Sequence, residues 1–94
     1  KLLKPGQHFV DRHRTALINR VTDTEHILDK LIEKELISKE QYDDVRASKT
    51  KREQMRDIHT LVIAAGKTGK EALYRILKGM KSMKPLVSEL ERSG

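Results

Sequence analysis

Residues 23–44 read DTEHILDKLIEKELISKEQYDD. In the first half of this segment, apolar residues recur three and four positions apart, as they do on one face of a helix. In the second half, Ser38 stands three residues before Gln41, a pair that can form a capping box at the start of a helix. The segment therefore predicts two helices joined by a short turn.

The same segment is the acidic part of a basic chain. It holds eight carboxylates and three lysines, a local charge of −5, whereas the whole chain of 94 residues has a net charge of +6. Residues 1–22, 45–70 and 71–94 carry net charges of +4, +5 and +2. A chain with separated basic and acidic segments can present complementary surfaces to another copy of itself.

Outside this segment, the remaining apolar residues also follow helical periodicity, and no alternating strand pattern occurs. We expect the first helix to begin near His8 and the last near Ser82, with Pro85 in its first turn, where a missing amide is tolerated. Pro5 and Gly6 favour a linker tail over residues 1–7, which leaves a domain at 8–94. Capping-box pairs predict the other helix starts: Thr22/Glu25, Ser38/Gln41, Thr50/Glu53 and Thr68/Glu71. We therefore predict an all-α fold, an antiparallel bundle of six helices.

Composition limits the possible function classes. The length allows one domain, and the absence of cysteine excludes disulfides and thiolate chemistry. No apolar run approaches the roughly 18 residues that a membrane helix needs, so we expect a soluble protein. A pI near 9.7 is compatible with nucleic-acid binding.

Motifs for catalysis are missing. Residues 66–70 read GKTGK, but a phosphate-binding loop needs a glycine at position 61, which is Leu61, and we expect an inter-helix turn ending in a capping box instead. The sequence predicts no catalytic residue, no metal site and no cofactor. Four histidines show no metal-ligand spacing and are expected at scattered surface or boundary positions: His8, His13, His26 and His59.

Basic clusters leave a nucleic-acid-binding domain as a less favoured alternative. Arg52 and Arg56 at the start of the fourth predicted helix, and Arg14 and Arg20 on the first, could contact phosphates. The chain has one Phe, two Tyr and no Trp, which is a poor supply for stacking on single-stranded bases. The residues alone leave open that these clusters are solvated helix faces without a binding role. Among binding functions, a protein partner is preferred to nucleic acid.

Three segments resemble the caspase recruitment domain (CARD) of the death-fold superfamily: HFVDRHRTALINRVTDTEHILDKLIEKELISKEQYDDVR (8–46), QMR (54–56) and VSELERS (87–93). The resemblance implies a six-helix Greek-key bundle whose first helix is often kinked. It also implies a non-enzymatic, cytoplasmic inflammasome-adaptor domain that self-assembles into filaments and recruits an inflammatory caspase by CARD–CARD contact. The alternative within the family is the CARD of an NLR-type inflammasome sensor. A sensor CARD is a further implied partner, whereas nucleic acid and membranes are not.

The resemblance also assigns two docking faces. A basic face on the first and fourth helices would meet an acidic face on the second and third helices of the next copy. Asp57 departs from the family pattern, which has a basic residue there, and should weaken the basic face locally. The resemblance matches Arg14, Arg20 and Arg56 to the basic face and Glu25, Asp29 and Glu40 to the acidic face. To these we add Arg52, from the basic cluster of the fourth predicted helix, and Asp23 and Asp43, which depart from the family pattern and strengthen the acidic face.

Overall fold

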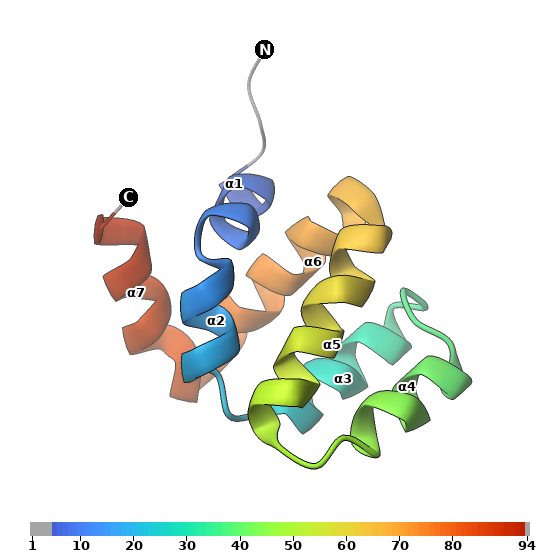
Figure 1. Ribbon diagram of the computed structural model, residues 1–94. Coiled ribbons are helices and arrows are strands. Elements are labelled where there is room, and N and C mark those ends of the chain that lie inside the picture. The colour runs from blue at the N-terminus through green and yellow to red at the C-terminus, as the bar shows by residue number, and fades with distance from the viewer. Residues whose placement is uncertain (1–4, 94) are drawn as a thin grey trace.

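The computed structural model describes residues 5–93, with side chains described for residues 9–92, and over that range it contains helices and no strand (Figure 1). The all-α prediction is confirmed. The helices are α1 (Pro5–Arg12), α2 (Arg14–Arg20), α3 (Thr24–Glu33), α4 (Lys39–Arg46), α5 (Lys51–Ala64), α6 (Gly66–Gly79), the 3₁₀ helix η1 (Lys81–Met83) and α7 (Lys84–Ser93).

The described residues form seven α-helices, so the predicted count of six is wrong by one. The first predicted helix is broken at His13, whose φ of −109° and ψ of 27° leave the helical region. The break lets α1 pack on α6 while α2 packs on α5. It agrees with the kink that the resemblance implies. Helix α1 also begins at Pro5, three residues before the expected start at His8, because proline needs no amide partner at the first helical position.

Two of the four helix starts predicted from capping pairs are confirmed, and the pair Ser38/Gln41 is a full capping box. The Ser38 side chain accepts a hydrogen bond from the Gln41 amide at 3.1 Å, and Gln41 Oε1 accepts one from the Ser38 amide at 2.9 Å. Thr50 caps α5 by accepting from the Glu53 amide at 3.0 Å. Each bond satisfies a donor that the helix start leaves without an intrahelical partner.

The other two capping pairs are wrong for different reasons. Thr24, not Thr22, lies at the start of α3, and its buried hydroxyl donates to Gln54 of α5. Thr68 lies inside the first turn of α6, because Gly66 takes a left-handed φ of +72° that lets α6 follow directly on α5. The GKTGK segment is thus the beginning of a helix and not the turn we expected.

The core lies where α6 meets α1, α3, α5 and α7. Gly69 permits the close approach of α5, since a Cβ there would stand 2.5 Å from the Val62 carbonyl oxygen. None of the described helices is long and apolar enough to cross a membrane. The main buried apolar side chains include Val10, Leu17, Ile27, Leu28, Leu31, Met55, Ile58, Leu73 and Leu77.

His59 corrects the expectation that all four histidines lie at the surface or its boundary. Its side chain is fully buried, and its Nε2 lies 3.3 Å from the Val10 carbonyl oxygen of α1. His13 is half-buried and His26 is exposed, whereas the side chain of His8 lies outside the described ones. The position of His59 on α5, one turn after Met55, places it on the face that meets α1.

Candidate protein-binding surfaces

The four predicted basic residues lie on α2 and α5, which pack side by side (Figure 1). Arg14 is the first residue of α2 and Arg20 the last, while Arg52 and Arg56 are one turn apart on α5. All four are exposed. Together they give this pair of helices a basic surface, called here the basic face.

Arg20 is already engaged within the molecule. Its guanidinium donates two hydrogen bonds of 2.9 Å to the two carboxylate oxygens of Glu89 on α7. These bonds raise the pKa of Arg20 and lower the pKa of Glu89, as expected of a bidentate pair that favours both charged forms. In the described part of the chain, the side chains of Arg14, Arg52 and Arg56 have no such ion pair.

The predicted acidic residues lie on α3, on α4 and at Asp23, just before α3. Helices α3 and α4 run antiparallel, and two contacts define how they align. The Tyr42 hydroxyl donates to the Asp29 carboxylate at 2.6 Å, which raises the pKa of Tyr42, and Arg46 lies 3.2 Å from the Glu25 carboxylate. Glu25 and Asp29 are therefore brought to the edge of α3 that faces α4.

This acidic face is interleaved with cations. Lys39 forms an ion pair with Asp43 at 2.8 Å, and the nitrogen of Lys39 lies 5.5 Å from the centre of the Tyr42 ring. Asp23 and Glu40 are exposed, and within the described residues their carboxylates make no hydrogen bond or ion pair. Asp23 and Glu40 are thus the members of the acidic face whose charge is not already partnered.

The side chains that bind residues of the two faces within the same molecule were not predicted from the sequence. Glu89 is 69 positions away from Arg20, and no local pattern connects them. Arg46 and Tyr42 were visible as neighbours of the acidic residues, one helical turn apart on α4. Their contacts with α3 depend on how the two helices align, which periodicity alone does not give.

Asp57 lies apart from the basic face. It is half-buried and accepts a hydrogen bond of 2.8 Å from the Ser48 hydroxyl, in the connection between α4 and α5. The expectation that Asp57 weakens the basic face therefore has no support from its position, since its carboxylate is turned to the α4–α5 connection.

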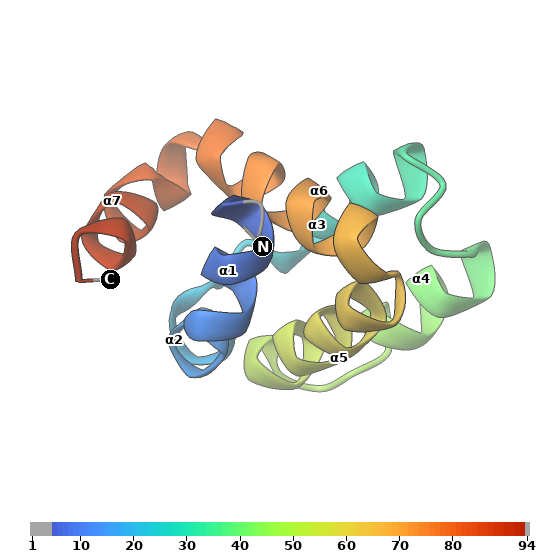
Figure 2. The ribbon, with the colours of Figure 1, turned by 90° about the horizontal axis from the view of Figure 1, so that it is seen from above.

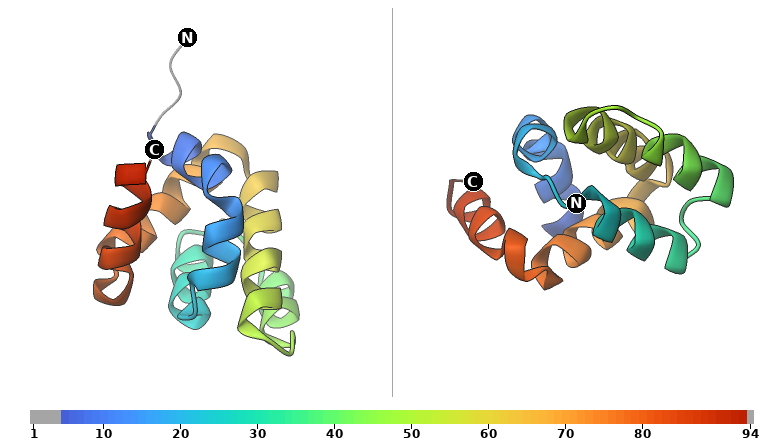
Figure 3. Two further views of the ribbon diagram at one scale, coloured as in Figure 1. Left: turned by 60° about the vertical axis from the view of Figure 1, so that its left-hand side comes forward. Right: turned by 90° about the horizontal axis from the view of Figure 1, so that it is seen from below.

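Helix α5 separates parts of the two faces: in Figure 2 and in the right-hand view of Figure 3, α2 lies on one side of α5 and α4 on the other. The faces come close at the α2–α3 connection, where Asp23 follows Arg20 by three positions. Among the described residues, no group of three or more His, Asp or Glu side chains is arranged to hold a metal ion. The chemistry that the arrangement offers is charge pairing between proteins, with exposed guanidinium groups in one place and exposed carboxylates in another.

Exposed charges of both signs on a small helical bundle are typical of protein-interaction domains. The family model described as "caspase recruitment domain" matches residues 7–93, so the chain belongs to the CARD family. The proteins named "apoptosis-associated speck-like protein containing a CARD" from Bos taurus and Mus musculus are 43% and 40% identical to it, over 99% and 92% of this chain. The Mus musculus protein "NACHT, LRR and PYD domains-containing protein 1b allele 3" is 36% identical over 93% of this chain.

The chain spans only part of each of these relatives. It covers 46% and 43% of the bovine and mouse speck-like proteins and 7% of the NACHT protein. The similarity therefore concerns one domain of each relative.

Proposed function

We propose that this CARD is the recruiting domain of an inflammasome adaptor, that it assembles head to tail into filaments in the cytoplasm, and that it recruits the CARD of an inflammatory caspase. One observation carries the proposal: α2 and α4, which contribute to the basic and acidic faces, lie on opposite sides of α5 (Figure 2). The similarity to speck-like proteins over nearly the whole chain supports the adaptor assignment.

The parts of the two faces that α5 separates cannot pair within a monomer. They can pair between copies, and because the two surfaces in contact differ, the contact repeats without closing unless the rotation happens to form a ring. Each exposed ion pair contributes about 1 kcal/mol or less. A polymer contains many such pairs, and each contact excludes water from the pairs around it. The assembly is therefore cooperative. A different CARD with either face could then join the end of the polymer, which is how a caspase would be recruited.

A second candidate is the CARD of an NLR-type sensor, which the similarity to the NACHT protein favours. The two candidates differ in the size of the whole protein. From the shares that this chain spans, an adaptor would be about twice the length of the chain and a sensor more than about ten times its length. An immunoblot of the endogenous protein with an antibody against this domain separates them.

Charge reversal tests the assembly mechanism. Arg14→Glu on the basic face and Asp29→Lys on the acidic face should each block self-association while the monomer stays folded, because both residues are exposed. Mixed together, the two variants keep one intact face each and should form limited complexes but no long polymers. Light scattering measures both effects.

Asp29 also accepts the Tyr42 hydrogen bond, so Tyr42→Phe is the matched control. It removes the bond, keeps the carboxylate and should still assemble. If Asp29→Lys polymerises like the parent protein and binds a labelled oligonucleotide more tightly, the acidic residues are not a docking face. That result would favour the nucleic-acid-binding alternative over the adaptor.

A further inference from the structure

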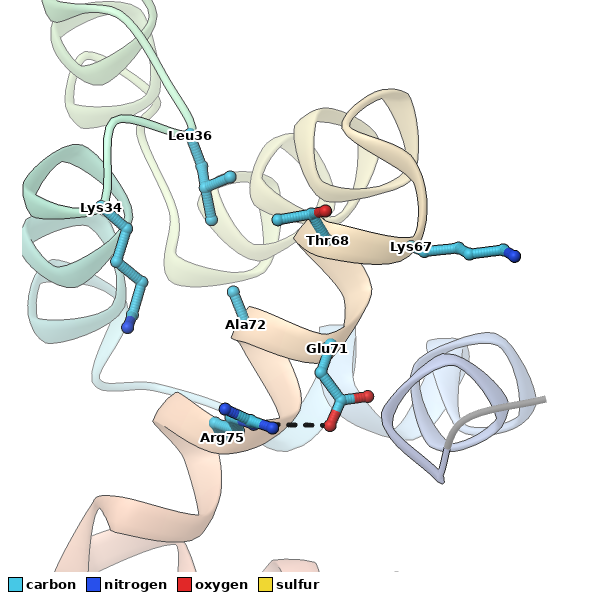
Figure 4. Close-up of a pocket in the computed structure, with 7 residues that line it drawn as sticks. All are labelled: Lys34, Leu36, Lys67, Thr68, Glu71, Ala72 and Arg75. Atoms are coloured by element: carbon cyan, nitrogen blue, oxygen red, sulfur yellow. Dashed lines mark ion pairs between the residues drawn. The ribbon is translucent and has the colours of Figure 1, made fainter.

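Two adjoining hollows lie in the groove between α3 and α6, away from the arginines of α2 and α5. The first has a volume of about 320 Å³ and includes Lys67 and Ala72 in its lining (Figure 4). The second has a volume of about 330 Å³ and includes Lys30 in its lining. Lys34 and Arg75 line both, so the two hollows form one continuous groove.

The groove is positively charged. Lys34 extends from the end of α3 into the space between α3 and α6 (Figure 4). Its amine makes no hydrogen bond or ion pair within the described part of the chain. Lys30 lines only the second hollow, and its amine lies 3.6 Å from the Glu33 carboxylate at the end of α3. Lys67 lines only the first hollow and extends outward from the first turn of α6 (Figure 4).

One carboxylate, that of Glu71, contributes to the lining. It extends away from Lys34 in Figure 4 and lies 3.5 Å from the Arg75 guanidinium, which is largely exposed. Glu71 therefore holds Arg75 loosely at the edge of the groove and leaves most of its five donors open. Three lysines and this arginine outnumber the single acidic group around the two hollows.

The rest of the lining restricts the kind of ligand. Its apolar part consists of small and aliphatic side chains such as Leu36, Ala72 and Ile76. The exposed imidazole of His26 is the one aromatic ring in the lining of the two hollows, so they offer little surface on which a nucleobase could stack. Guanidinium and ammonium groups recognise phosphate oxygens by charge-assisted hydrogen bonds. The volumes suit a compact small molecule more than an extended chain.

We propose that the groove between α3 and α6 binds a compact polyphosphorylated small molecule, with Lys34 and Arg75 lining both hollows and Lys30 and Lys67 lining one hollow each. The site is separate from the proposed assembly faces and does not depend on them. Its ligand class is defined by clustered phosphates, whether on a phosphoanhydride chain or on a polyol ring.

Titration of the ¹⁵N-labelled chain with tripolyphosphate, followed by NMR at an ionic strength of about 0.15 M, tests the site. We expect saturating shifts of the backbone amides around Lys34, Thr68 and Arg75 with one ligand bound. Lys34→Ala and Arg75→Ala should each weaken binding by about tenfold, because each removes a charge-assisted contact. Lys51→Ala is the matched control, since Lys51 is exposed on α5 outside the groove, and it should bind like the parent chain.

A parallel titration with inositol hexakisphosphate distinguishes the two sources of clustered phosphate. Tighter binding of that compound assigns the site to phosphorylated polyols, and tighter binding of tripolyphosphate assigns it to phosphoanhydride chains. Circular dichroism of each variant shows whether it is folded. Shifts that spread over α2 and α5 without saturating, or unchanged affinity in both folded groove variants, would overturn the proposal.

Discussion

Glu89 holds both terminal nitrogens of Arg20, so a partner carboxylate must compete with it for the guanidinium. Glu89→Gln weakens this competition and adds one positive charge beside α2. We expect faster self-association at low salt, with stability little changed because the pair is exposed. The lag time of light scattering measures the effect.

Glu91→Gln is the control for this substitution. It makes the same change of charge on α7, but Glu91 accepts from the Tyr74 hydroxyl and not from Arg20. If Glu89→Gln assembles no faster than Glu91→Gln, the claim that Glu89 competes with a docking partner for Arg20 is wrong.

His59 predicts a dependence of stability on pH. Burial lowers the pKa of His59 below its ordinary value of 6.5, and among the described residues Nδ1 has no hydrogen-bond partner. Arg14 and Lys70 lower this pKa further, while the Val10 carbonyl and Asp11 act in the opposite direction. Because the unfolded chain binds this proton more readily, the free energy of unfolding should be at its full value above pH 6.5 and fall as the pH drops below it.

Urea unfolding between about pH 7.5 and pH 5 measures this dependence, in a range above the titration of most carboxylates. His59→Leu removes the titrating group and should flatten the curve there, even if it lowers the overall stability. A parent curve that is already flat from about pH 6.5 to pH 5 would contradict the burial of a neutral His59.

At the scale of helices, Gly69 and Gly79 of α6 form a matched pair. A Cβ at Gly69 would lie 2.5 Å from the Val62 carbonyl oxygen, a backbone atom of α5 that cannot move alone, whereas a Cβ at Gly79 meets nothing within 4 Å. Gly69→Ala should therefore lower the free energy of unfolding by about 1–3 kcal/mol, as over-packing does. Gly79→Ala should be neutral or stabilising by up to about 1 kcal/mol.

Thermal or urea unfolding of both variants checks this prediction. Equal stabilities for Gly69→Ala and Gly79→Ala would show that α5 and α6 are not in close backbone contact at Gly69.

The helices themselves were largely predictable, because apolar periodicity and the caps at Ser38 and Thr50 are local signals. The break at His13 was not predictable from these signals, since neither Gly nor Pro marks it and it follows from α1 and α2 packing on different helices. At the candidate site, the position of the four arginines on α2 and α5 could be predicted from the sequence. The partner of Arg20 could not, because Glu89 reaches it only through the docking of α7.

At the scale of the whole molecule, the separation of charge gives the assembly a measurable signature. Exposed charges interact over a screening length of about 10 Å at 0.1 M salt and about 3 Å at 1 M. A contact built from Arg14, Arg52 and Arg56 against exposed carboxylates should therefore weaken steeply as salt is added. Assembly through apolar surface would respond weakly or in the opposite direction.

Electron microscopy of the purified domain, at about 50 mM and about 0.5 M salt, shows whether charge pairing drives the assembly. We expect filaments at low salt, few or none at high salt, and none with Arg14→Glu at either concentration. A domain that stays monomeric at low salt, or filaments that form equally well with Arg14→Glu, would contradict assembly by charge pairing.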